Sequence, residues 1–475
     1  MNILSAQFLS LSGIAKNLNV ELLGEDKNFN NISIDSRSLT KGDLYIAISG
    51  DRFDGHDFIA EAMAKGAIGC VVEQSQKDNR ALSQLVVKDS KLALGQIASI
   101  WAEKWKQQNT EARKVIAITG SCGKTTLKEM ICSIAIQKFK AKDAVLSTIG
   151  NLNNEFGVPL TLMRLNSKHQ LAIIEMGANH LQEIAYLSGL VKADIAIITN
   201  AGSAHVEGFG SLEAVAKGKG EIFSTLPEQS IAIINNDDIY ANYWKSLIDK
   251  SNHKIVSFAI KNKADISAEQ QTSSIEDDLY LWQVTTDEGV FSIKLPSPGK
   301  HNLANALAAI ATGQLIGASI TQIQQGLQQF ENVSGRLEVS KKQQRFTLIN
   351  DSYNANPESV KAAIDVLAAY PNKEKILVLG DMGELGKQQQ QLHQQVGEYA
   401  ANSQIKNLYT LGELSKHTLK GFQSSSKSTL AKSFDSISEL NEYLTKIDLN
   451  DSVVLIKGSR NMAMEEVVVA LEDMN

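Results

Sequence analysis

Three observations in the sequence predict an α/β protein of three domains. The chain has 475 residues, which is enough for two to four domains with full-sized cores. Short apolar runs typical of strands alternate with segments whose apolar residues recur at helical spacing. One of these runs leads directly into a glycine-rich turn followed by a helix-like segment, an arrangement typical of mostly parallel sheets covered by helices.

Composition and charge further limit the kind of protein this can be. Hydrophobic residues make up 43% of the chain and charged residues 21%, as in ordinary globular proteins. The net charge of −6 argues against a surface for nucleic acid or anionic lipid. Cys70, Cys122 and Cys132 lack metal-ligand spacing and suggest reduced thiols. With no signal-peptide pattern and no long apolar stretch, we expect a cytoplasmic protein without a membrane span, and a monomer.

The first predicted domain covers residues 1–87. Strand-like runs at 32–34, 44–48 and 68–72 surround a helix-like segment at 57–67. We expect a small α/β domain here.

The second predicted domain, residues 88–332, contains the most regular alternation of strands and helices. Its apolar runs are β-like and are separated by helix-like stretches, so a mostly parallel sheet is expected. These runs are VIAI (115–118), AVLSTI (144–149), LAIIEM (171–176), DIAIITN (194–200), IAIIN (231–235) and KIVSFAI (254–260).

The third predicted domain, residues 333–475, repeats the pattern and is expected to be Rossmann-like. A Gln-rich stretch at 386–400 is interpreted as a solvated helix. The strands and helices are predicted at 346–350, 358–370, 375–381, 407–413, 452–458 and 461–474.

Residues 114–130, KVIAITGSCGKTTLKEM, carry the clearest functional motif. They depart from the pattern G-x-x-x-x-G-K-[ST], because Ile118 holds the first glycine position and a glycine stands instead at Gly120. Strand, turn and helix N-terminus would aim free N–H groups at phosphate oxygens, with Lys124 near the β- and γ-phosphates and Thr125 on Mg²⁺. The alternative is a plain turn that contains Gly and Lys by chance; the strand–turn–helix context favours a nucleotide site.

Candidate metal ligands follow the neighbouring strands. Glu175 ends one strand-like run, and Asn200 ends the next and leads to His205. Carboxyl ends of sheet strands face the ligand crevice of open α/β sheets. His205 taken alone is better explained as a loop histidine, since Mg²⁺ prefers oxygen. Lys217 and Lys219 taken alone would be a solvated helix face.

Two strand-to-helix turns in the third domain also carry polar residues. Asn356 and Pro357 are explained as a helix cap and a first helical turn. The remaining polar residues suit a cleft that binds anionic groups. They are Asp351, Tyr353, Asn354, Lys457, Ser459 and Arg460.

In this order the motifs resemble the ATP-dependent Mur ligases of peptidoglycan synthesis, over essentially the whole chain. The D-N-P-R motif typical of the members that add diaminopimelate is absent, and the similar folylpolyglutamate synthases lack the block at 35–59. The set is most similar to the members that add D-alanyl-D-alanine to UDP-N-acetylmuramoyl-tripeptide. It consists of TGSCGKTT, GNLNNEFGVPLT, EMGANHLQEIA, HVEGFGS, PGKHNLANALAA, SGRLE, NDSYNANPESVKAA, LGDMGELG and KGSRNMAMEEV.

The resemblance implies roles for individual residues. Catalytic roles fall to Lys124, Glu175, His205 and Lys219. ATP would be bound by Gly120, Ser121, Cys122, Gly123, Lys124, Thr125, Thr126, Asn302, Arg336 and Asp351. Two Mg²⁺ ions would be held by Thr125, Glu175, His205 and Lys219 as a carbamate, with Lys217 an alternative for the modified lysine. The UDP-substrate and the dipeptide would contact Ser36, Arg37, Asp54, Gly55, His56, Asn151, Tyr353, Asn354, Lys457, Ser459 and Arg460.

The resemblance also implies a mechanism. A substrate carboxylate would attack the γ-phosphate of ATP, and the amine of D-alanyl-D-alanine would displace phosphate from the acyl phosphate. The third domain would close on ATP, with hinges near residues 86–90 and 331–336. Three alternatives stay open: a ligase that adds the third residue, an ATP-driven motor or switch, and a non-catalytic binder of UDP-muramyl peptide. Whether the third residue of the accepted peptide is diaminopimelate or lysine also stays open.

Overall fold

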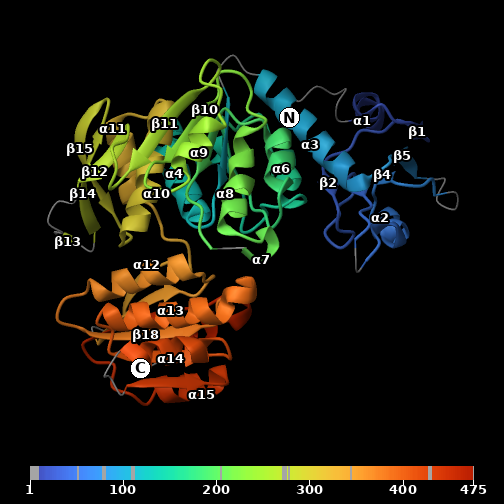
Figure 1. Ribbon diagram of the computed structural model, residues 1–475. Coiled ribbons are helices and arrows are strands. Elements are labelled where there is room, and N and C mark those ends of the chain that lie inside the picture. Colours follow the sequence, from blue (N-terminus) through green and yellow to red (C-terminus); the bar gives the residue numbers. More distant parts are fainter. Residues whose placement is uncertain are drawn as a thin grey trace.

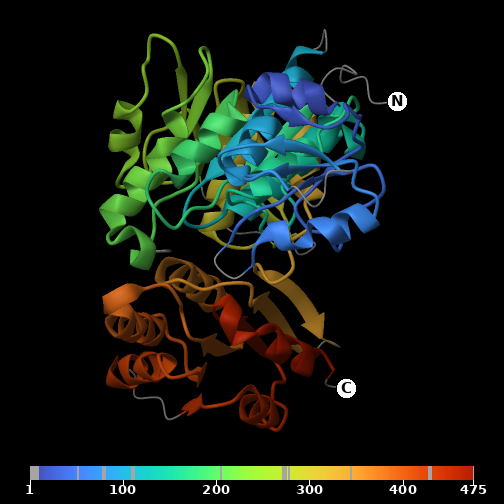
Figure 2. The same cartoon turned by 90° about the vertical axis from the view of Figure 1, so that its right-hand side faces the viewer.

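The computed structural model describes residues 10–50, 53–76, 82–108, 113–203, 206–269, 275–276, 279–342, 345–425 and 430–473. Its strands form three separate sheets, so the predicted α/β class with three sheet-forming regions is confirmed. The N-terminal and central regions lie side by side, and the C-terminal region lies below them in both Figures 1 and 2. The sheets fall within the three predicted segments; the exact domain boundaries stay predictions.

The N-terminal sheet has the order β1-β5-β4-β3-β2 and is parallel except for β1 against β5. Its helix α1 begins at the cap Ser10, whose hydroxyl accepts from the N–H of Gly13. Its elements are α1 Leu11–Leu18, β1 Leu22–Leu23, β2 Ile32–Ser33, β3 Leu44–Ile46, η1 Gly55–Phe58, α2 Ile59–Ala64, β4 Gly69–Val72 and β5 Ser83–Val86.

The central sheet has the order β13-β14-β12-β11-β10-β9-β6-β8-β7, with β15 paired to β14. From β12 to β7 it is parallel, as predicted, while β12 to β15 form an antiparallel extension that the sequence prediction missed. Its strands are β6 Lys114–Thr119, β7 Val145–Ser147, β8 Leu171–Glu175, β9 Ile195–Ile198, β10 Ile231–Asn235, β11 Lys254–Ala259, β12 Ile266–Glu269, β13 Ile275–Glu276, β14 Leu279–Thr286 and β15 Gly289–Leu295.

Helices cover both faces of the central sheet. Along β6, Val115 and Ala117 join one hydrophobic cluster while Ile116 and Ile118 join the other, because successive side chains of a strand point to opposite faces. The helices are α3 Ser90–Gln107, α4 Lys124–Phe139, η3 Lys142–Ala144, α5 Gly157–Met163, α6 Glu183–Val191, α7 Val206–Phe209, α8 Leu212–Gly220, η4 Glu221–Phe223, α9 Ala241–Ser246, α10 Lys300–Leu315 and α11 Ile320–Gln328.

The C-terminal sheet has the order β16-β17-β21-β18-β19-β20 and is parallel except for β16 against β17. Its strands are β16 Glu338–Lys342, β17 Phe346–Asp351, β18 Glu374–Gly380, β19 Asn407–Leu411, β20 Ala431–Phe434 and β21 Ser452–Lys457. Its helices are α12 Pro357–Ala368, η5 Gly386–Gln388, α13 Gln389–Asn402, α14 Ser415–Ser425, α15 Ile437–Leu444, η6 Arg460–Met462 and α16 Glu465–Glu472.

Helix α13 corrects one prediction. The Gln-rich segment is a helix, as expected, but it is not simply solvated. Its buried face includes His393 and Val396, and the His393 Nε2 accepts from the N–H of Met382 at 2.9 Å. A Cβ on Gly397 would lie 1.9 Å from the Thr418 carbonyl oxygen, so α13 and α14 touch through their backbones. Gly397 makes this contact possible, while His393 ties α13 to the segment that follows β18.

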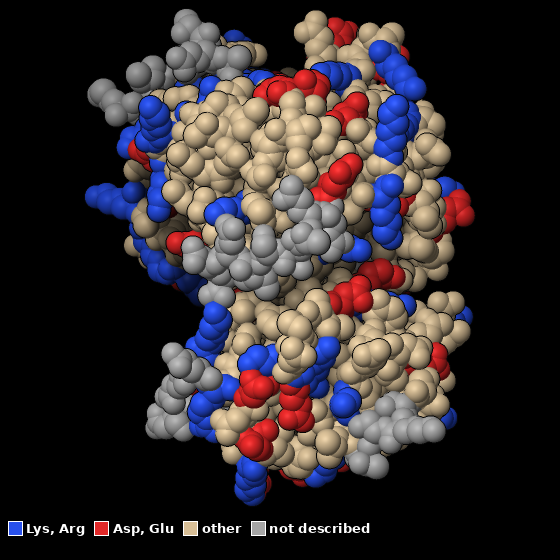
Figure 3. Space-filling view, turned by 90° about the vertical axis from the view of Figure 1, so that its left-hand side faces the viewer, with Lys and Arg blue, Asp and Glu red and all other residues tan. Residues whose placement is uncertain are grey.

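The distribution of charged side chains on the surface agrees with the mixed acidic and basic composition of the chain. On the face that Figure 3 shows, Lys and Arg side chains are interspersed with Asp and Glu over both the upper and the lower body. Among the described residues, every helix is too short or too polar to span a bilayer.

Candidate active site

The phosphate-type loop lies at the carboxyl end of β6, between β8 and β9. After β6 the chain forms β7 and then β8 on one side of β6, and later β9 on the other, so the loop sits at a switch point of the sheet. Gly120 has φ of 144° and Gly123 has φ of 86°. A Cβ on Gly120 would lie 1.9 Å from Thr199 Oγ1, and one on Gly123 would lie 2.5 Å from Asn305 Oδ1. Both glycines are therefore required by backbone conformation and by close neighbours.

Neighbouring side chains hold the loop in place. The N–H of Cys122 donates to Asn200 Oδ1 at 3.0 Å, and Asn200 Nδ2 donates to the Cys122 carbonyl at 3.1 Å. Ser121 Oγ donates to the carbonyl of Gly202 at 3.1 Å. Asn200 thus reaches the predicted crevice, where its amide fixes the loop backbone.

Helix α4 begins at Lys124, so its N-terminus faces the loop. Lys124 Nζ lies 2.6 Å from the Gly120 carbonyl oxygen. Burial lowers the pKa of Lys124, and the nearby Glu175 carboxylate acts in the opposite direction. Thr126, the last residue of the GKTT motif, is buried on the same helix.

Glu175 ends β8 and is 2% exposed. Thr125 Oγ1 donates to its Oε2 at 2.9 Å, and Asn153 Nδ2 donates to its Oε1 at 2.8 Å. A hydroxyl and a carboxylate at hydrogen-bond distance are oxygen donors of the kind that Mg²⁺ prefers. Thr125 and Glu175 therefore fit a magnesium site. Among the described residues, no three or more His, Cys, Asp or Glu side chains are grouped so that they could hold a metal ion by themselves.

The predicted ligand His205 lies outside the described residues. The two lysines of α8, by contrast, are distinguished by burial. Lys219 is fully buried, with Nζ 3.5 Å from the Ala178 carbonyl oxygen and 5.3 Å from the ring centre of Phe209. Burial and the charge of Lys124 lower the pKa of Lys219 to about 7.

Lys217 lies on the solvent side of α8. Its side chain is 53% exposed, and its Nζ pairs with Glu213 Oε1 at 2.8 Å, which raises the pKa of Lys217. The solvated-face interpretation therefore holds for Lys217 and is wrong for Lys219.

Asn302 lies in the first turn of α10, which packs against α4. Its Nδ2 donates to the Pro298 carbonyl at 2.9 Å, which leaves its Oδ1 as an acceptor. Its predicted role in binding ATP stays a prediction.

The C-terminal residues Arg336, Asp351, Tyr353, Asn354 and Lys457 form one group, in which Asp351 and Lys457 are buried, Arg336 and Tyr353 are partly exposed and Asn354 is exposed. The Lys457 Nζ lies 2.6 Å from Asp351 Oδ2 and 2.8 Å from the Asn354 carbonyl oxygen. Burial raises the pKa of Asp351, although the charge of Lys457 acts in the opposite direction. The Arg336 guanidinium stacks on Tyr353 at 4.2 Å from the ring centre, and its Nε is buried without a hydrogen-bond partner.

Ser459 and Arg460 lie at a second part of the cleft. The Ser459 Oγ accepts from the N–H of Gly383 at 2.6 Å, while Arg460 is exposed and pairs with Glu465 at 2.8 Å. The cleft is lined by Asn354, Ala355, Asn356, Gly383, Glu384, Ser459, Arg460 and Asn461.

The C-terminal region contacts the loop directly through the start of α12. Asn356 caps α12, as predicted, and its Nδ2 donates to Cys122 Sγ at 3.0 Å. Glu358 accepts from Ser203 Oγ at 2.6 Å and from the N–H of Ser203 at 3.0 Å. Burial raises the pKa of the Cys122 thiol, so the thiolate form, which reacts with thiol reagents, is disfavoured in this arrangement.

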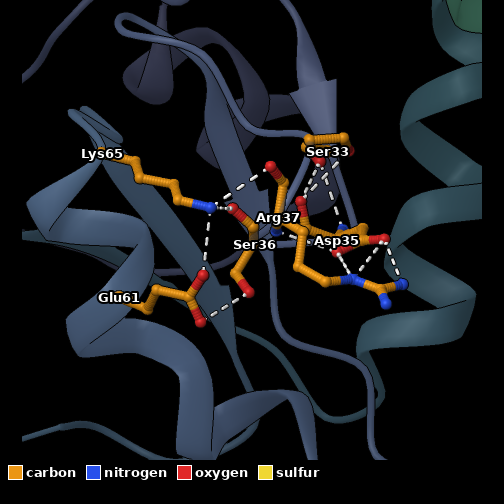
Figure 4. Close-up of polar contacts among 7 residues, drawn as sticks. Ser33, Asp35, Ser36, Arg37, Glu61 and Lys65 are labelled. Carbon is orange, nitrogen blue, oxygen red and sulfur yellow. Dashed lines mark hydrogen bonds and ion pairs between the residues drawn. The ribbon is translucent and has the colours of Figure 1, made fainter.

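The predicted N-terminal residues lie in two groups. Figure 4 shows Ser36 and Arg37 held by side chains of the same domain. Lys65 Nζ donates to the carbonyls of Ser36 at 2.9 Å and Arg37 at 3.2 Å, and Ser36 Oγ donates to Glu61 Oε2 at 3.1 Å. Arg37 pairs with Asp35 at 2.8 Å, which lowers the pKa of Asp35 to about 2. The loop is thus fixed while the Arg37 side chain stays exposed.

In the second group, the Asp54 carboxylate lies 2.6 Å from His56 Nδ1. A Cβ on Gly55 would lie 2.5 Å from the backbone nitrogen of Ile48, so this glycine is explained by packing. Asn151 is exposed on the segment that follows β7.

Sequence reasoning missed Lys128, Thr148, Asn153 and Asn305. Thr148 and Asn153 contact Glu175, Asn305 lies against Gly123 of the loop, and Lys128 donates to the Thr148 carbonyl. The available signal was weak: Lys128 lies four residues after Lys124 on the same helix face, and Asn153 belongs to the segment GNLNNEFGVPLT. The structure brings the loop residues Gly120 to Thr126 together with Glu175. The start of α12 adds a contact between Asn356 and Cys122, whereas the predicted N-terminal residues lie in another domain.

Comparisons with known proteins agree with this architecture. Three family models match: Mur ligase family, catalytic domain, at residues 28–102; Mur ligase middle domain at 118–313; and Mur ligase, glutamate ligase domain, at 335–460. The chain is 40% identical to UDP-N-acetylmuramoyl-tripeptide–D-alanyl-D-alanine ligase of Escherichia coli over 470 residues, 98% of each chain.

Solved structures are similar over nearly the same length. MurF from Acinetobacter baumannii matches with a TM-score of 0.87 and 34% identity, covering 98% of both chains. MurF ligase from Thermotoga maritima in complex with ADP matches with a TM-score of 0.80 and 26% identity, covering 94% of this chain and 97% of that one.

Proposed function

Because this chain belongs to the Mur ligase family, we propose that it is an ATP-dependent amide ligase that joins D-alanyl-D-alanine to UDP-N-acetylmuramoyl-tripeptide. The product would be the pentapeptide precursor of peptidoglycan. The proposal is supported by full-length similarity to UDP-N-acetylmuramoyl-tripeptide–D-alanyl-D-alanine ligases. It is also supported by the site, where Lys124, Thr125, Glu175 and the buried Lys219 are all present around one loop.

The chemistry follows from the poor reactivity of a carboxylate. A carboxylate oxygen of the tripeptide attacks the γ-phosphorus of ATP, the bond to the β-phosphate oxygen breaks, and ADP leaves. The amine nitrogen of D-alanyl-D-alanine then attacks the acyl carbon, loses its proton, and phosphate leaves with the electrons of the C–O bond. Lys124 and the N–H groups at the start of α4 offset the negative charge that collects as carboxylate and triphosphate approach.

Thr125 and Glu175, with His205, would hold Mg²⁺, which when bound neutralises charge on the phosphates. We further infer that Lys219 is the carbamylated lysine, rather than Lys217. A neutral amine attacks the carbon of CO₂ and releases a proton, which leaves a carbamate anion able to bind a second cation. The lowered pKa of Lys219 supports this assignment, because burial favours its neutral form.

The C-terminal domain would bind the dipeptide and complete the ATP site. Contacts of Asn356 with Cys122 and of Glu358 with Ser203 support docking of α12 on the loop. The Nε of Arg336 is buried without a hydrogen-bond partner, and the Arg336 charge acts on Asp351, which supports a role of Arg336 with phosphate. Closure around residues 86–90 and 331–336 would exclude water from the acyl phosphate. Identical X-ray scattering profiles with and without an ATP analogue and the UDP-substrate would contradict closure.

The N-terminal domain would bind the UDP part of the substrate through Ser36, Arg37 and the turn at 54–56. We also propose that the protein works in the cytoplasm as a monomer. The three cysteines are free, which supports a reducing compartment.

The proposal is tested by phosphate release from ATP with UDP-N-acetylmuramoyl-tripeptide, with and without D-alanyl-D-alanine. Release is expected to require the dipeptide and to be lost in Lys124→Ala, which removes the cation at the loop. Release that does not depend on the dipeptide would reject the assignment. Replacement of the dipeptide by a third-residue amino acid, with UDP-N-acetylmuramoyl-dipeptide as acceptor, distinguishes the alternative ligase.

A further inference from the structure

Lys128 is a buried cation with no role in the chemistry described above. It lies one turn after Lys124 on α4 and is 2% exposed. Its Nζ donates to the Thr148 carbonyl oxygen at 2.6 Å and pairs with Glu129 Oε1 at 2.7 Å. Burial of a lysine is costly unless its charge and hydrogen bonds are satisfied. An apolar residue would fill this position at lower cost, so the ammonium group has a specific use.

The carbonyl that Lys128 binds belongs to a residue whose three polar groups are all engaged. Thr148 is 1% exposed and follows β7. Its N–H donates to the Ile173 carbonyl at 3.1 Å, and its Oγ1 accepts from the N–H of Glu175 at 2.9 Å. Thr148 therefore connects α4 to the end of β8, where the Glu175 carboxylate is placed.

Thr148 is also the point at which residues 149–156 leave the sheet. Asn153, on that segment, donates its Nδ2 to Glu175 Oε1 at 2.8 Å and accepts the N–H of Gly177 at 2.8 Å. One carboxylate oxygen of Glu175 is thus oriented by Thr125 of α4, and the other by a segment that begins at Thr148.

We propose that Lys128 is a positioning residue for the divalent cation site. It fixes the distance between α4, which carries Thr125, and the segment that orients Glu175. Lys128 does not touch the cation or the substrates. The inference rests on the proposed function, in which Thr125 and Glu175 hold Mg²⁺. Loss of such an indirect partner of a metal ligand typically costs about 10- to 100-fold in metal affinity.

The test uses the full chain with ADP and titrates Mn²⁺, with free Mn²⁺ followed by electron paramagnetic resonance. Lys128→Met is expected to weaken Mn²⁺ binding at least about ten-fold. ADP affinity measured in EDTA is expected to stay unchanged, because the loop itself is intact. The matched control is Arg113→Met. Arg113 is another buried cation of this domain that donates to backbone carbonyls, those of Trp105 and Ser167, but it lies at the amino end of β6.

Each outcome decides between explanations. No Mn²⁺ binding by the unmodified chain with ADP would reject the metal site, and the inference with it. Mn²⁺ binding that is unchanged in Lys128→Met, or equally weakened in Arg113→Met, would overturn the positioning role and leave the ligase assignment intact. If Lys128→Met does not fold, Thr148→Val breaks the next contact of the proposed path, from the Glu175 N–H to the Thr148 hydroxyl, and Thr148→Ser keeps that contact, while the backbone carbonyl that Lys128 binds is present in both. Weak binding only in Thr148→Val supports the inference, and equal binding in both rejects it.

Discussion

Replacement of Lys219 provides the sharpest test of the proposed active site. Lys219 is fully buried on α8, and its pKa falls from the ordinary value of 10.5 to about 7. At pH 7.5, an amine with a pKa of about 7 is about three-quarters neutral, whereas an amine with a pKa of 10.5 is about 0.1% neutral. Lys219 therefore presents several hundred times more reactive amine to CO₂ than a surface lysine.

The assay is ¹³C nuclear magnetic resonance of the protein in ¹³C-bicarbonate. We expect a carbamate signal that is present in Lys217→Arg and absent in Lys219→Arg. Arginine is a long basic side chain like lysine but does not carbamylate at neutral pH, because its guanidinium stays protonated. The Lys217 pKa is raised by Glu213, so this residue is the matched control on the same helix.

The pH dependence has a definite sign. Because only the neutral amine reacts, lowering the pH from 7.5 to 6 at constant dissolved CO₂ reduces the neutral fraction from about three-quarters to about one-tenth. The initial rate at which the carbamate signal appears should fall about eight-fold over this range, and the proton released in the reaction shifts the equilibrium against the carbamate as well. A signal that persists in Lys219→Arg, or that does not change between pH 7.5 and 6, would refute the reasoning.

Three further predictions follow from particular contacts. Gly120→Ala would place a Cβ 1.9 Å from Thr199 Oγ1 and should weaken ADP binding at least about ten-fold; wild-type affinity by calorimetry would contradict this. Lys65→Ala should raise KM for the UDP-substrate with kcat unchanged, because the backbone at Ser36 and Arg37 loses its two hydrogen bonds from the Lys65 ammonium group. An effect on kcat alone would argue against this prediction. Glu358→Ala removes the acceptor for Ser203 and should increase the radius of gyration in X-ray scattering, whereas an identical profile would show that this contact does not hold the domains.

Much of the fold was predictable because the relevant signals are local. The phosphate loop combines a buried strand, two glycines with positive φ and a helix that starts at Lys124, all within about ten residues. The strands of the parallel sheets are continuous apolar runs, since both of their faces are buried. The antiparallel pair β14–β15 was missed, although its strands flank a tight turn at Gly289, because alternating polarity gives a weaker signal.

The site was predictable only in part. Glu175 could be placed at a strand end from sequence, whereas its partners Thr125 and Asn153 come from segments 50 and 22 residues away. No local pattern separates Lys217 from Lys219, because both lie on one short helix and differ only in what packs against them.

The sequence alone therefore determines the local backbone structure, namely the strands, the glycine turn and the capped helices. These elements depend on φ angles and on residues that are neighbours along the chain. What tertiary structure decides is the chemical state of the side chains. Burial by Phe209 and the charge of Lys124 lower the pKa of Lys219, and contact with Asn356 shields Cys122. These effects depend on desolvation and on charges brought together from distant parts of the chain, which spacing along the sequence does not encode.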